Sequence, residues 1–412
     1  MSESNKRGTA ECRACSSSQL FSGLDLGSLP IANELFLQPS EFELFPLHLK
    51  VCRICGLGQV GEVVSASRLF SDYRYLSSIS STFINHARTY AKEILSQNDW
   101  RESDWVLEIA SNDGYLLRNF VERGRRVLGI EPASNIARVA IQEGIPTINE
   151  FFSSNLAQRI LKEYGHPRLI VANNVFAHVP DIQDFTYGLS ILMSERTQVS
   201  IENPSIINLI KSLQFDSIYH EHYSYLSANA VSKLMNKNGL SISKIEHINT
   251  HGGSNRYWIS KNLQVDCESV ANAIKLELNE GLLNEHRWQT FSKEVNRVIT
   301  EFRYFVEEKN SLGQVVVGYG AAAKASTLLN ASGVSAGSIP YIIDESPEKV
   351  GRFMPSRMIP IVDSSHLLRS KPDHVVIFPW NISSEIAKKI RMLCNSSKIQ
   401  IWRAIPRLEE VA

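Results

Sequence analysis

The stretch WVLEIASNDGYLL (residues 105–117) decides the fold of this chain. It is predicted to be a short apolar strand with Glu108 at its carboxyl end, followed by small polar residues, Gly114 and a helix. Farther on, RVLGIE (126–131) and RLIVANNVF (168–176) are predicted strands, and helical segments separate them. Alternation of this kind predicts a parallel sheet with helices on both faces.

The loop after the first strand is a candidate site for an adenosine cofactor. Glu131 ends the second strand about twenty residues after Glu108, where a carboxylate can accept both ribose hydroxyls. The loop departs from the G-x-G-x-x-G fingerprint of dinucleotide sites. S-adenosylmethionine (SAM) has no pyrophosphate and is therefore favoured over a dinucleotide, with a ligand-free strand–turn–helix as the structural alternative. The candidate cofactor-binding residues are Glu108, Ala110, Asn112, Gly114, Glu131, Pro132 and Asn174.

Four of the six cysteines form two C-x-x-C pairs near the start of the chain. Cys12, Cys15, Cys52 and Cys55 follow the spacing C-x2-C-x36-C-x2-C, which is typical of a tetrahedral zinc site. Four thiolates leave no open coordination position, so the zinc is expected to be structural. Residues 1–65 are predicted to form short strands and turns with few large apolar side chains, so the metal should supply much of their folding free energy. Two unrelated pairs of buried thiols are the alternative.

The segment FDSIYHEHYSYLS (215–227) gathers titratable side chains with few apolar neighbours. A histidine beside a carboxylate or a tyrosine is a candidate general base, and burying so many polar groups requires each of them to be satisfied. A structural hydrogen-bond network is one alternative. A second metal site is another, ranked lower because consecutive residues alternate faces in an extended backbone. NNVFAHVPD (173–181) should place Asn174 and His178 at the same carboxyl edge as Glu108.

A second strand–glycine–helix unit, QVVVGYGAAAKASTLLN (314–330), opens the last third of the chain. Gly318 and Gly320 lie at its predicted turn, and Lys324 lies in the first helical turn, which suits a pyrophosphate. A tight turn needed only for packing explains the glycines equally well. A long helix should precede this unit, because six apolar residues are spaced three and four apart: Trp288, Phe291, Val295, Val298, Phe302 and Phe305.

Length and composition set the wider limits. A chain of 412 residues needs two or three domains, predicted here as 1–65, 66–260 and 261–412. Lys plus Arg (43) balances Asp plus Glu (43), which argues against a nucleic-acid partner. No apolar run approaches the roughly 18 residues of a membrane span, and the N-terminus lacks the apolar core of a secretory signal. We therefore expect a cytoplasmic protein, plausibly a monomer although a dimer is possible.

Several blocks, taken together, resemble a known family. They are CRAC/CRIC, YRYLSS, LEIASNDGYLL, GIEPA, ANNVFAHVPD, FDSIYHEHYSYLS, HGGSNR, GYGAAAKASTLLN and FPWN, in that order along nearly the whole chain. In these blocks the chain is similar to the three-domain sugar C-methyltransferases, which act on TDP-linked 4-keto deoxysugars. The resemblance implies an α/β protein with a small N-terminal zinc-binding module, a central Rossmann-like SAM domain and a C-terminal Rossmann-like domain that helps to hold the nucleotide sugar.

The resemblance also implies roles for individual residues. His222 matches the family's catalytic base, with Glu221 and Tyr219 beside it. His178 and Tyr73, the latter preferred over Tyr75, match residues close to the substrate. Gly318, Gly320 and Lys324 are the candidate contacts to the nucleotide sugar, either TDP- or GDP-linked. Two departures stand out: Ala110 replaces a glycine of the SAM loop, and AAAKAS replaces the usual A-P-A-K-G-N.

Other functions fit parts of the same pattern. An NAD-dependent oxidoreductase acting on nucleotide sugars is one alternative, since either glycine loop could accept a dinucleotide. A non-enzymatic zinc-ribbon scaffold is another, although an intact YHEH segment disfavours it. Methylation of a sugar oxygen or nitrogen is a rival within the methyltransferases.

Overall fold

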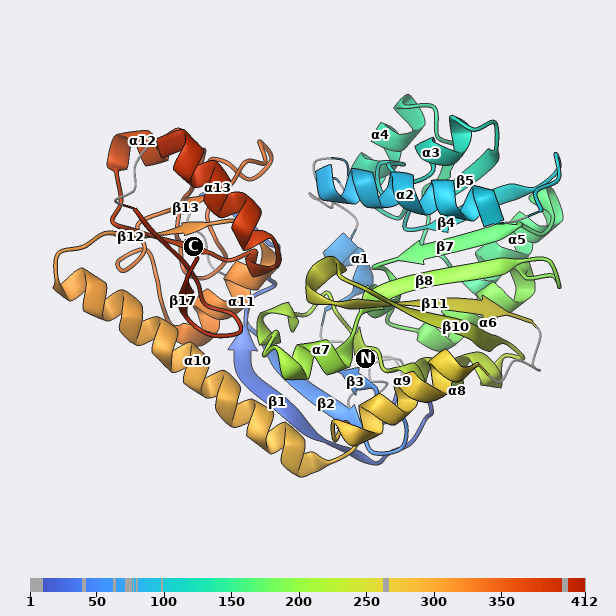
Figure 1. Cartoon of the computed structure of the whole chain (residues 1–412), viewed down its shortest axis with the longest axis horizontal. Helices are drawn as coiled ribbons and strands as arrows, with labels where there is room; N and C mark the ends of the chain where they lie inside the picture. Colours follow the sequence, from blue (N-terminus) through green and yellow to red (C-terminus); the bar gives the residue numbers. More distant parts are fainter. Residues whose placement is uncertain are drawn as a thin grey trace.

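Three β-sheets define three parts of the molecule (Figure 1). The computed structural model describes residues 10–38, 42–61, 64–70, 76, 78, 81–97, 99–261, 267–394 and 399–411. Within them, the sheets have four, seven and six strands. The prediction of a small N-terminal module followed by two α/β units is confirmed.

The N-terminal module is built on a long antiparallel hairpin. Its elements are β1 (Leu20–Leu29), β2 (Phe45–Cys52), β3 (Gly58–Gln59) and α1 (Ala66–Phe70). The sheet order is β1-β2-β3-β9, so its fourth strand, β9 (Ser224–Tyr225), comes from the distant YHEH segment. The prediction of only short strands was wrong, because β1 has ten residues and β2 has eight.

The long strands are stabilised by a helix from the other end of the chain. Leu24, Leu47 and Val51 of the hairpin share one hydrophobic core with Trp288 and Phe291 of α10 (Glu285–Ser311). Gly23 of β1 leaves room for the Trp288 ring, because an added Cβ would lie 3.0 Å from it. The module is therefore supported by this apolar contact in addition to any metal.

The central domain contains a seven-stranded sheet in the order β10-β11-β8-β7-β4-β5-β6. The five strands from β6 to β8 are parallel, and β11 and β10 are antiparallel additions. The strands are β4 (Trp105–Ile109), β5 (Arg126–Ile130), β6 (Thr147–Ile148), β7 (Leu169–Asn173), β8 (Gln198–Pro204), β10 (Ser241–Ile248) and β11 (Ser254–Ser260). The strand order reverses between β4 and β7, where open α/β sheets bind ligands.

Helices cover both faces of this sheet (Figure 1). The helices α2 (Ser81–Gln97), α3 (Arg118–Val121) and α4 (Ser134–Gln142) pack on one face. The opposite face is covered by α5 (Ser154–Tyr164), α6 (Ile182–Leu192) and α8 (Ala228–Lys237). Two further helices are α7 (Ile206–Lys211) and α9 (Glu268–Asn279).

The C-terminal domain has a second, smaller sheet in the order β14-β13-β12-β15-β16-β17. All neighbouring pairs are parallel except β16 and β17. Its elements are β12 (Val316–Tyr319), α11 (Ala323–Ser332), β13 (Ile342–Ile343), β14 (Ile361–Val362), α12 (His366–Ser370), β15 (His374–Ile377), α13 (Ser383–Cys394), β16 (Gln400–Arg403) and β17 (Glu409–Glu410).

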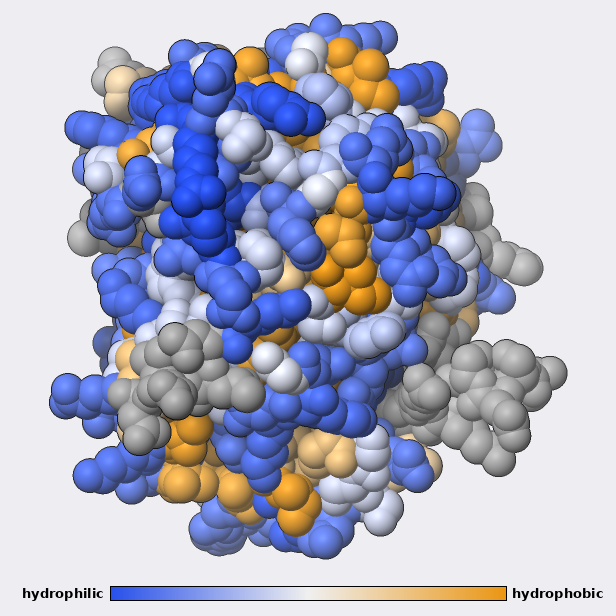
Figure 2. Space-filling view, turned by 90° about the vertical axis from the view of Figure 1, so that its right-hand side faces the viewer, coloured by the Kyte–Doolittle hydropathy of each residue, from blue (hydrophilic) through white to orange (hydrophobic). Residues whose placement is uncertain are grey.

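The helix α10 joins the three parts, running from beside β1 to the C-terminal sheet (Figure 1). Its apolar face is the predicted one: Trp288, Phe291, Val295, Val298, Phe302 and Phe305 are all buried. Across the described residues we find no helix with the length and apolarity needed to span a membrane. The face shown in Figure 2 is mainly hydrophilic, with apolar residues in separate patches.

Candidate functional site

The loop after β4 has a strained backbone conformation. Ala110, Asn112 and Gly114 all have positive φ angles, of 56°, 51° and 77°. A positive φ is strained for alanine and is tolerated better by asparagine and glycine. Strain of this kind is found where a loop is shaped for a ligand. Ala110 therefore adopts a backbone conformation that glycine adopts more readily.

Two buried carboxyl groups flank this loop. The Glu131 carboxylate accepts hydrogen bonds from the backbone N–H of Asn112 (3.0 Å) and of Ala133 (2.9 Å), which hold it against the loop. Glu108 is 2% exposed, and burial raises its pKa well above the usual value, helped by the charges of Asp113 and Glu131. Its Oε2 has no hydrogen-bond partner among the described residues. An orphaned buried carboxyl oxygen fits a site that takes a polar or cationic ligand.

Substitution of Gly114 tests how tightly this loop is packed. A Cβ at Gly114 would lie 2.7 Å from Ile145 Cγ1, whereas Gly124, with φ of 71°, has nothing within 4 Å. We expect Gly124→Ala to cost about 1 kcal/mol of stability, from the positive φ alone. Gly114→Ala should cost a further ~1–3 kcal/mol through overpacking and should weaken SAM binding. Thermal denaturation and SAM calorimetry of both variants measure this, and equal losses would contradict the packing argument.

The YHEH segment forms a turn rather than an extended strand. The backbone N–H of His222 donates to the carbonyl of Tyr219 (3.0 Å), which closes a four-residue turn. The turn places the Tyr219 and His222 rings together, with centroids 4.1 Å apart. The expectation that these residues alternate faces in an extended backbone was therefore wrong, because the turn hydrogen bond brings the first and fourth residues to one side.

The His222 ring is held in one tautomer. Its Nδ1 lies 2.9 Å from the carbonyl oxygen of Ser217, which can only accept, so Nδ1 carries the proton. Its Nε2 then offers a lone pair, which accepts from the Tyr219 hydroxyl at 3.1 Å. A histidine whose ring is oriented so that Nε2 is an acceptor has the geometry of a general base.

His178 faces the same cluster from the central sheet. It follows β7, the parallel neighbour of β4, and its ring centroid lies 4.6 Å from that of His222. Its Nδ1 donates to the carbonyl of Glu221 at 2.7 Å, and burial lowers the pKa of His178 to about 4. A neutral His178 therefore has an acceptor at Nε2 and no spare donor.

The two residues between Tyr219 and His222 face the N-terminal module. The Glu221 carboxylate accepts from the backbone N–H (3.2 Å) and the side-chain amide (3.0 Å) of Asn33, and burial raises its pKa to about 6. His220 Nε2 donates to the carbonyl of Phe45 at 3.2 Å. Asn33 carried no signal in the sequence, because its contact spans 188 positions.

Tyr73 lies outside the described residues, and so does Tyr75. The neighbouring described segments do reach the site. The Phe70 ring packs edge-on against His178, with centroids 5.4 Å apart. The backbone N–H of Ser78 donates to the Asp113 carboxylate at 3.2 Å.

The second glycine loop is closely packed within the protein. Gly318 lies in β12, where an added Cβ would meet Phe378 at 2.7 Å, and at Gly320 it would meet Pro379 at 2.3 Å. Close packing is therefore sufficient to explain why both positions are glycine. Lys324 has a different environment, since its Nζ lies 3.9 Å from the centroid of the Trp380 ring and 3.1 Å from Asn381 Oδ1.

Trp380 links the C-terminal domain to the YHEH segment. Its Nε1 donates to Asp216 Oδ2 at 2.8 Å. Burial raises the pKa of Asp216 to about 6, and the nearby charge of Lys324 opposes that rise. Gly252 of the HGGS block allows this contact, because an added Cβ would lie 2.4 Å from Trp380. The turn that carries His222 is therefore held between two domains.

The four paired cysteines form a compact sulfur cluster. Their Sγ atoms all lie within 4.8 Å of one another, with Cys12 to Cys55 at 3.5 Å and Cys15 to Cys52 at 3.6 Å. A tetrahedral zinc with bonds of about 2.3 Å separates its sulfur ligands by about 3.8 Å, so these positions fit the metal. Of the described His, Cys, Asp and Glu residues, only this set forms such a group.

Comparisons with known proteins agree along most of the chain. Family models match residues 12–70 as a zinc-binding domain, 84–245 as a methyltransferase domain and 249–406 as a C-methyltransferase C-terminal domain. C-methyltransferase NovU of Streptomyces niveus is 32% identical over 382 residues, which covers 91% of each chain. The chain belongs to the C-methyltransferase family.

Solved structures resemble about half of this C-methyltransferase more distantly. Magnesium protoporphyrin IX methyltransferase from Synechocystis PCC 6803, with bound SAM, shares 14% identity at a TM-score of 0.34, over 48% of this chain and 89% of that chain. The PH0226 protein of Pyrococcus horikoshii OT3 shares 11% identity at a TM-score of 0.37, over 48% and 98%.

Family membership settles the class of reaction. The C-methyltransferase is an enzyme with SAM as methyl donor and with a zinc-binding domain. This favours methyl transfer over the NAD-dependent oxidoreductase and the zinc-ribbon scaffold, and carbon over oxygen or nitrogen as the acceptor.

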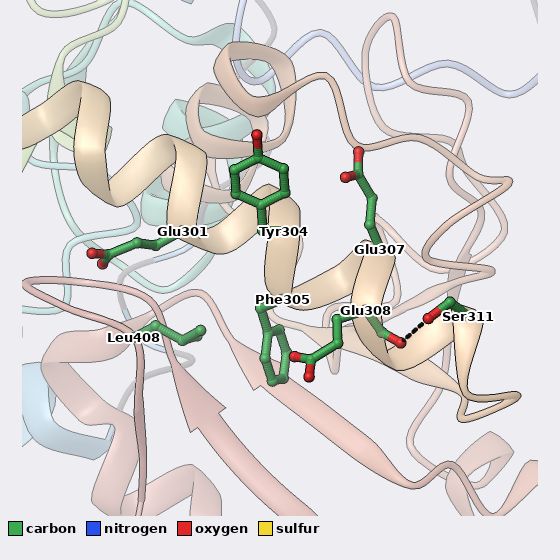
Figure 3. A pocket seen from close by; sticks show the side chains of 7 residues that line it. All are labelled: Glu301, Tyr304, Phe305, Glu307, Glu308, Ser311 and Leu408. Atoms are coloured by element: carbon green, nitrogen blue, oxygen red, sulfur yellow. Dashed lines mark hydrogen bonds between the residues drawn. The ribbon is translucent and has the colours of Figure 1, made fainter.

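A surface groove lies along α10, away from the histidines and the loop after β4 (Figure 3). It has a volume of about 750 Å³ and is lined by Glu301, Tyr304, Phe305, Glu307, Glu308, Ser311 and Leu408. None of its lining residues belongs to the histidine cluster, which is Tyr219, His222 and His178, or to the loop after β4. A smaller cavity, lined in part by Ala177, Asn203 and His222, adjoins the cluster itself.

Proposed function

We propose that this enzyme methylates the carbon next to the ketone of a nucleotide-linked keto-deoxysugar, in the biosynthesis of unusual deoxysugars. The observation that carries the proposal is the oriented His222 ring, with its Nε2 lone pair beside the Tyr219 hydroxyl. A hydrogen next to a ketone is acidic because the resulting anion spreads onto the carbonyl oxygen. A positioned base is therefore the group that such a reaction requires.

The residues divide the work as follows. His222 Nε2 accepts the proton from the sugar carbon, while the Ser217 carbonyl holds the ring in place. His178 is a weak proton acceptor because burial lowers its pKa to about 4, and it has no donor for an enolate oxygen while it is neutral. Tyr219 is the better donor, since its hydroxyl is within reach of His222 and can turn to the ketone oxygen. Glu221 and His178 hold the turn in shape.

SAM supplies the methyl group when it is bound. Glu108, Glu131 and Asn174, with the Ala110–Gly114 loop and Pro132, are the residues that we propose to line its site. They surround the reversal of strand order between β4 and β7, and His178 leaves the same edge. His178, which follows β7, therefore lies one strand away from the proposed SAM loop after β4.

Lys324 is the residue that we propose for the sugar nucleotide's diphosphate, at the N-terminus of α11 beside Gly318 and Gly320. The Lys324 ammonium group lies over the Trp380 ring, and Trp380 is hydrogen-bonded to Asp216, three residues before Tyr219. A cation of the C-terminal domain therefore lies near the YHEH turn. TDP and GDP sugars both supply the diphosphate. A reducing cytoplasm, which keeps thiols free to bind zinc, is the compartment that fits such an enzyme.

Replacing Lys324 with alanine should separate the two substrates. We expect the KM for the sugar nucleotide to rise about tenfold or more, because a charged hydrogen bond to phosphate is lost, with little change in the KM for SAM. Lys275→Ala, on the exposed surface of α9, is the control. An equal rise in both KM values would place Lys324 outside the sugar-nucleotide site.

The direct test is an incubation with SAM and a panel of TDP- and GDP-linked keto-sugars, analysed by mass spectrometry for the gain of one methyl group. A second measurement omits SAM and follows exchange of the sugar's α-hydrogen with D₂O by NMR. Exchange that depends on His222 supports the proposed deprotonation. Methyl transfer to none of the panel would overturn the substrate class.

A further inference from the structure

The first zinc knuckle, which is the C-x-x-C loop of Cys12 and Cys15, contacts the backbone of the residue that follows His222, the proposed base. Arg13 lies between Cys12 and Cys15, and its Nη1 donates to the carbonyl oxygen of Tyr223 at 2.7 Å. Its guanidinium also lies over the Tyr223 ring, 5.6 Å from the centroid. Tyr223 directly follows His222, so this arginine connects a metal-binding loop to the YHEH turn across 210 positions of sequence.

Arg13 is buried and held in place from several sides. It is 5% exposed, and its backbone N–H donates to Gln59 Oε1 at 2.9 Å. The side-chain amide of Gln183, from α6, donates to the carbonyls of Arg13 (2.8 Å) and Ala14 (2.7 Å). The knuckle is thereby attached to the central domain as well as to the turn.

The second zinc knuckle, which is the C-x-x-C loop of Cys52 and Cys55, contacts Ser227, four residues after Tyr223. Ser227 Oγ donates to the carbonyl of Cys55 at 2.9 Å. Between these two contacts, β9 pairs with β3, and the backbone N–H of Val60 donates to the carbonyl of Tyr223 at 3.1 Å. Residues 223–227 are therefore clamped to the zinc-binding module along their length.

The guanidinium suits this buried position. It keeps its charge when it is buried, and its planar fork can donate to a backbone carbonyl. The Nη1 contact therefore fixes the carbonyl group of Tyr223.

We propose that Arg13 is a positioning residue that uses the zinc knuckle to fix the backbone beside His222. The zinc site then supports catalysis as well as stability. This step relies on the proposed function only for the role of His222, since the coupling of the knuckle to the turn can be measured without any substrate.

The chain contains a matched control in its second knuckle. Arg53 follows Cys52 as Arg13 follows Cys12, but 43% of its side-chain surface is exposed. It pairs with Glu285 and lies over the Phe21 ring, and it does not contact residues 219–227 among the described interactions. Both arginines are replaced in the same way, Arg13→Met and Arg53→Met, in the full zinc-loaded chain.

Hydrogen–deuterium exchange with mass spectrometry tests the coupling itself. We expect peptides covering 219–227 to exchange about tenfold or more faster in Arg13→Met, because a buried charged hydrogen bond is lost. Arg53→Met should match the wild type, and Arg13→Lys, which keeps the charge, should be intermediate. Zinc content and SAM affinity, measured by elemental analysis and calorimetry, should be unchanged in all three variants.

Each outcome is decisive for the inference. Unchanged exchange in Arg13→Met, or equal acceleration in Arg53→Met, would overturn it. Loss of zinc from Arg13→Met alone would also overturn it, because the arginine would then serve the metal rather than the turn. A kcat lowered about tenfold with an unchanged KM for SAM would extend the effect to catalysis. If the wild type shows no methyltransferase activity but Arg13→Met still exchanges faster, the coupling stands and the proposed reaction is refuted.

Discussion

Replacing His222 with alanine is expected to lower kcat at least about a hundredfold while SAM affinity stays unchanged. The Ser217 contact orients the His222 ring so that the Nε2 lone pair can accept the proton. His178 is too weakly basic to replace it, because burial lowers its pKa to about 4. Steady-state kinetics and SAM calorimetry measure the two effects. The exposed His247 on β10 supplies the control variant, His247→Ala, which should retain full activity.

A companion variant separates the base from its neighbour. Tyr219→Phe removes the hydroxyl that donates to His222 Nε2 but keeps the ring beside it. We expect it to slow methyl transfer less than His222→Ala and to leave α-hydrogen exchange measurable. Near-normal turnover in His222→Ala would refute the assignment of His222 as the base, whatever Tyr219→Phe does.

Loss of a zinc ligand is expected to have the largest effect on stability. Cys55→Ser should abolish zinc binding and lower the free energy of unfolding by more than about 4 kcal/mol, because the metal's binding free energy is lost to the folded module. Cys55 is fully buried, so the loss cannot be offset by water. Elemental analysis and calorimetric melting measure zinc content and Tm.

The matched control for this change is Cys394→Ser, since Cys394 lies in α13 outside the sulfur cluster. It should keep one zinc per chain and a wild-type Tm. Full zinc occupancy in Cys55→Ser would contradict the four-cysteine site.

The periodic features of the fold were predictable from sequence. Alternating strands and helices indicated the parallel strands of both α/β sheets but not the antiparallel β10, β11 and β17. Spacing of three and four residues indicated the buried face of α10. The paired cysteines indicated a metal group because C-x-x-C places two thiols on one side of a turn. Glu108, Gly114 and Glu131 were candidates for the cofactor site because the sequence places them at or just after the ends of predicted strands.

Other features depended on contacts between distant residues. The long strands β1 and β2 pack against Trp288 of α10, and the Glu221 carboxylate accepts a hydrogen bond from the Asn33 side chain. The expected extended backbone at 219–222 was wrong because one hydrogen bond within a turn decides which side chains meet. The packing roles of Gly318 and Gly320 became visible only with Phe378 and Pro379 beside them.

By itself, the sequence determined the three-part organisation, the cysteine cluster and the chemical character of the YHEH segment, because periodicity, spacing and residue type are properties of neighbours along the chain. Only the tertiary structure decided which nitrogen of His222 carries the proton, which way Glu221 points and how Arg13 meets Tyr223. Those depend on carbonyl groups and side chains brought together across as many as 210 positions, where no local pattern records the contact.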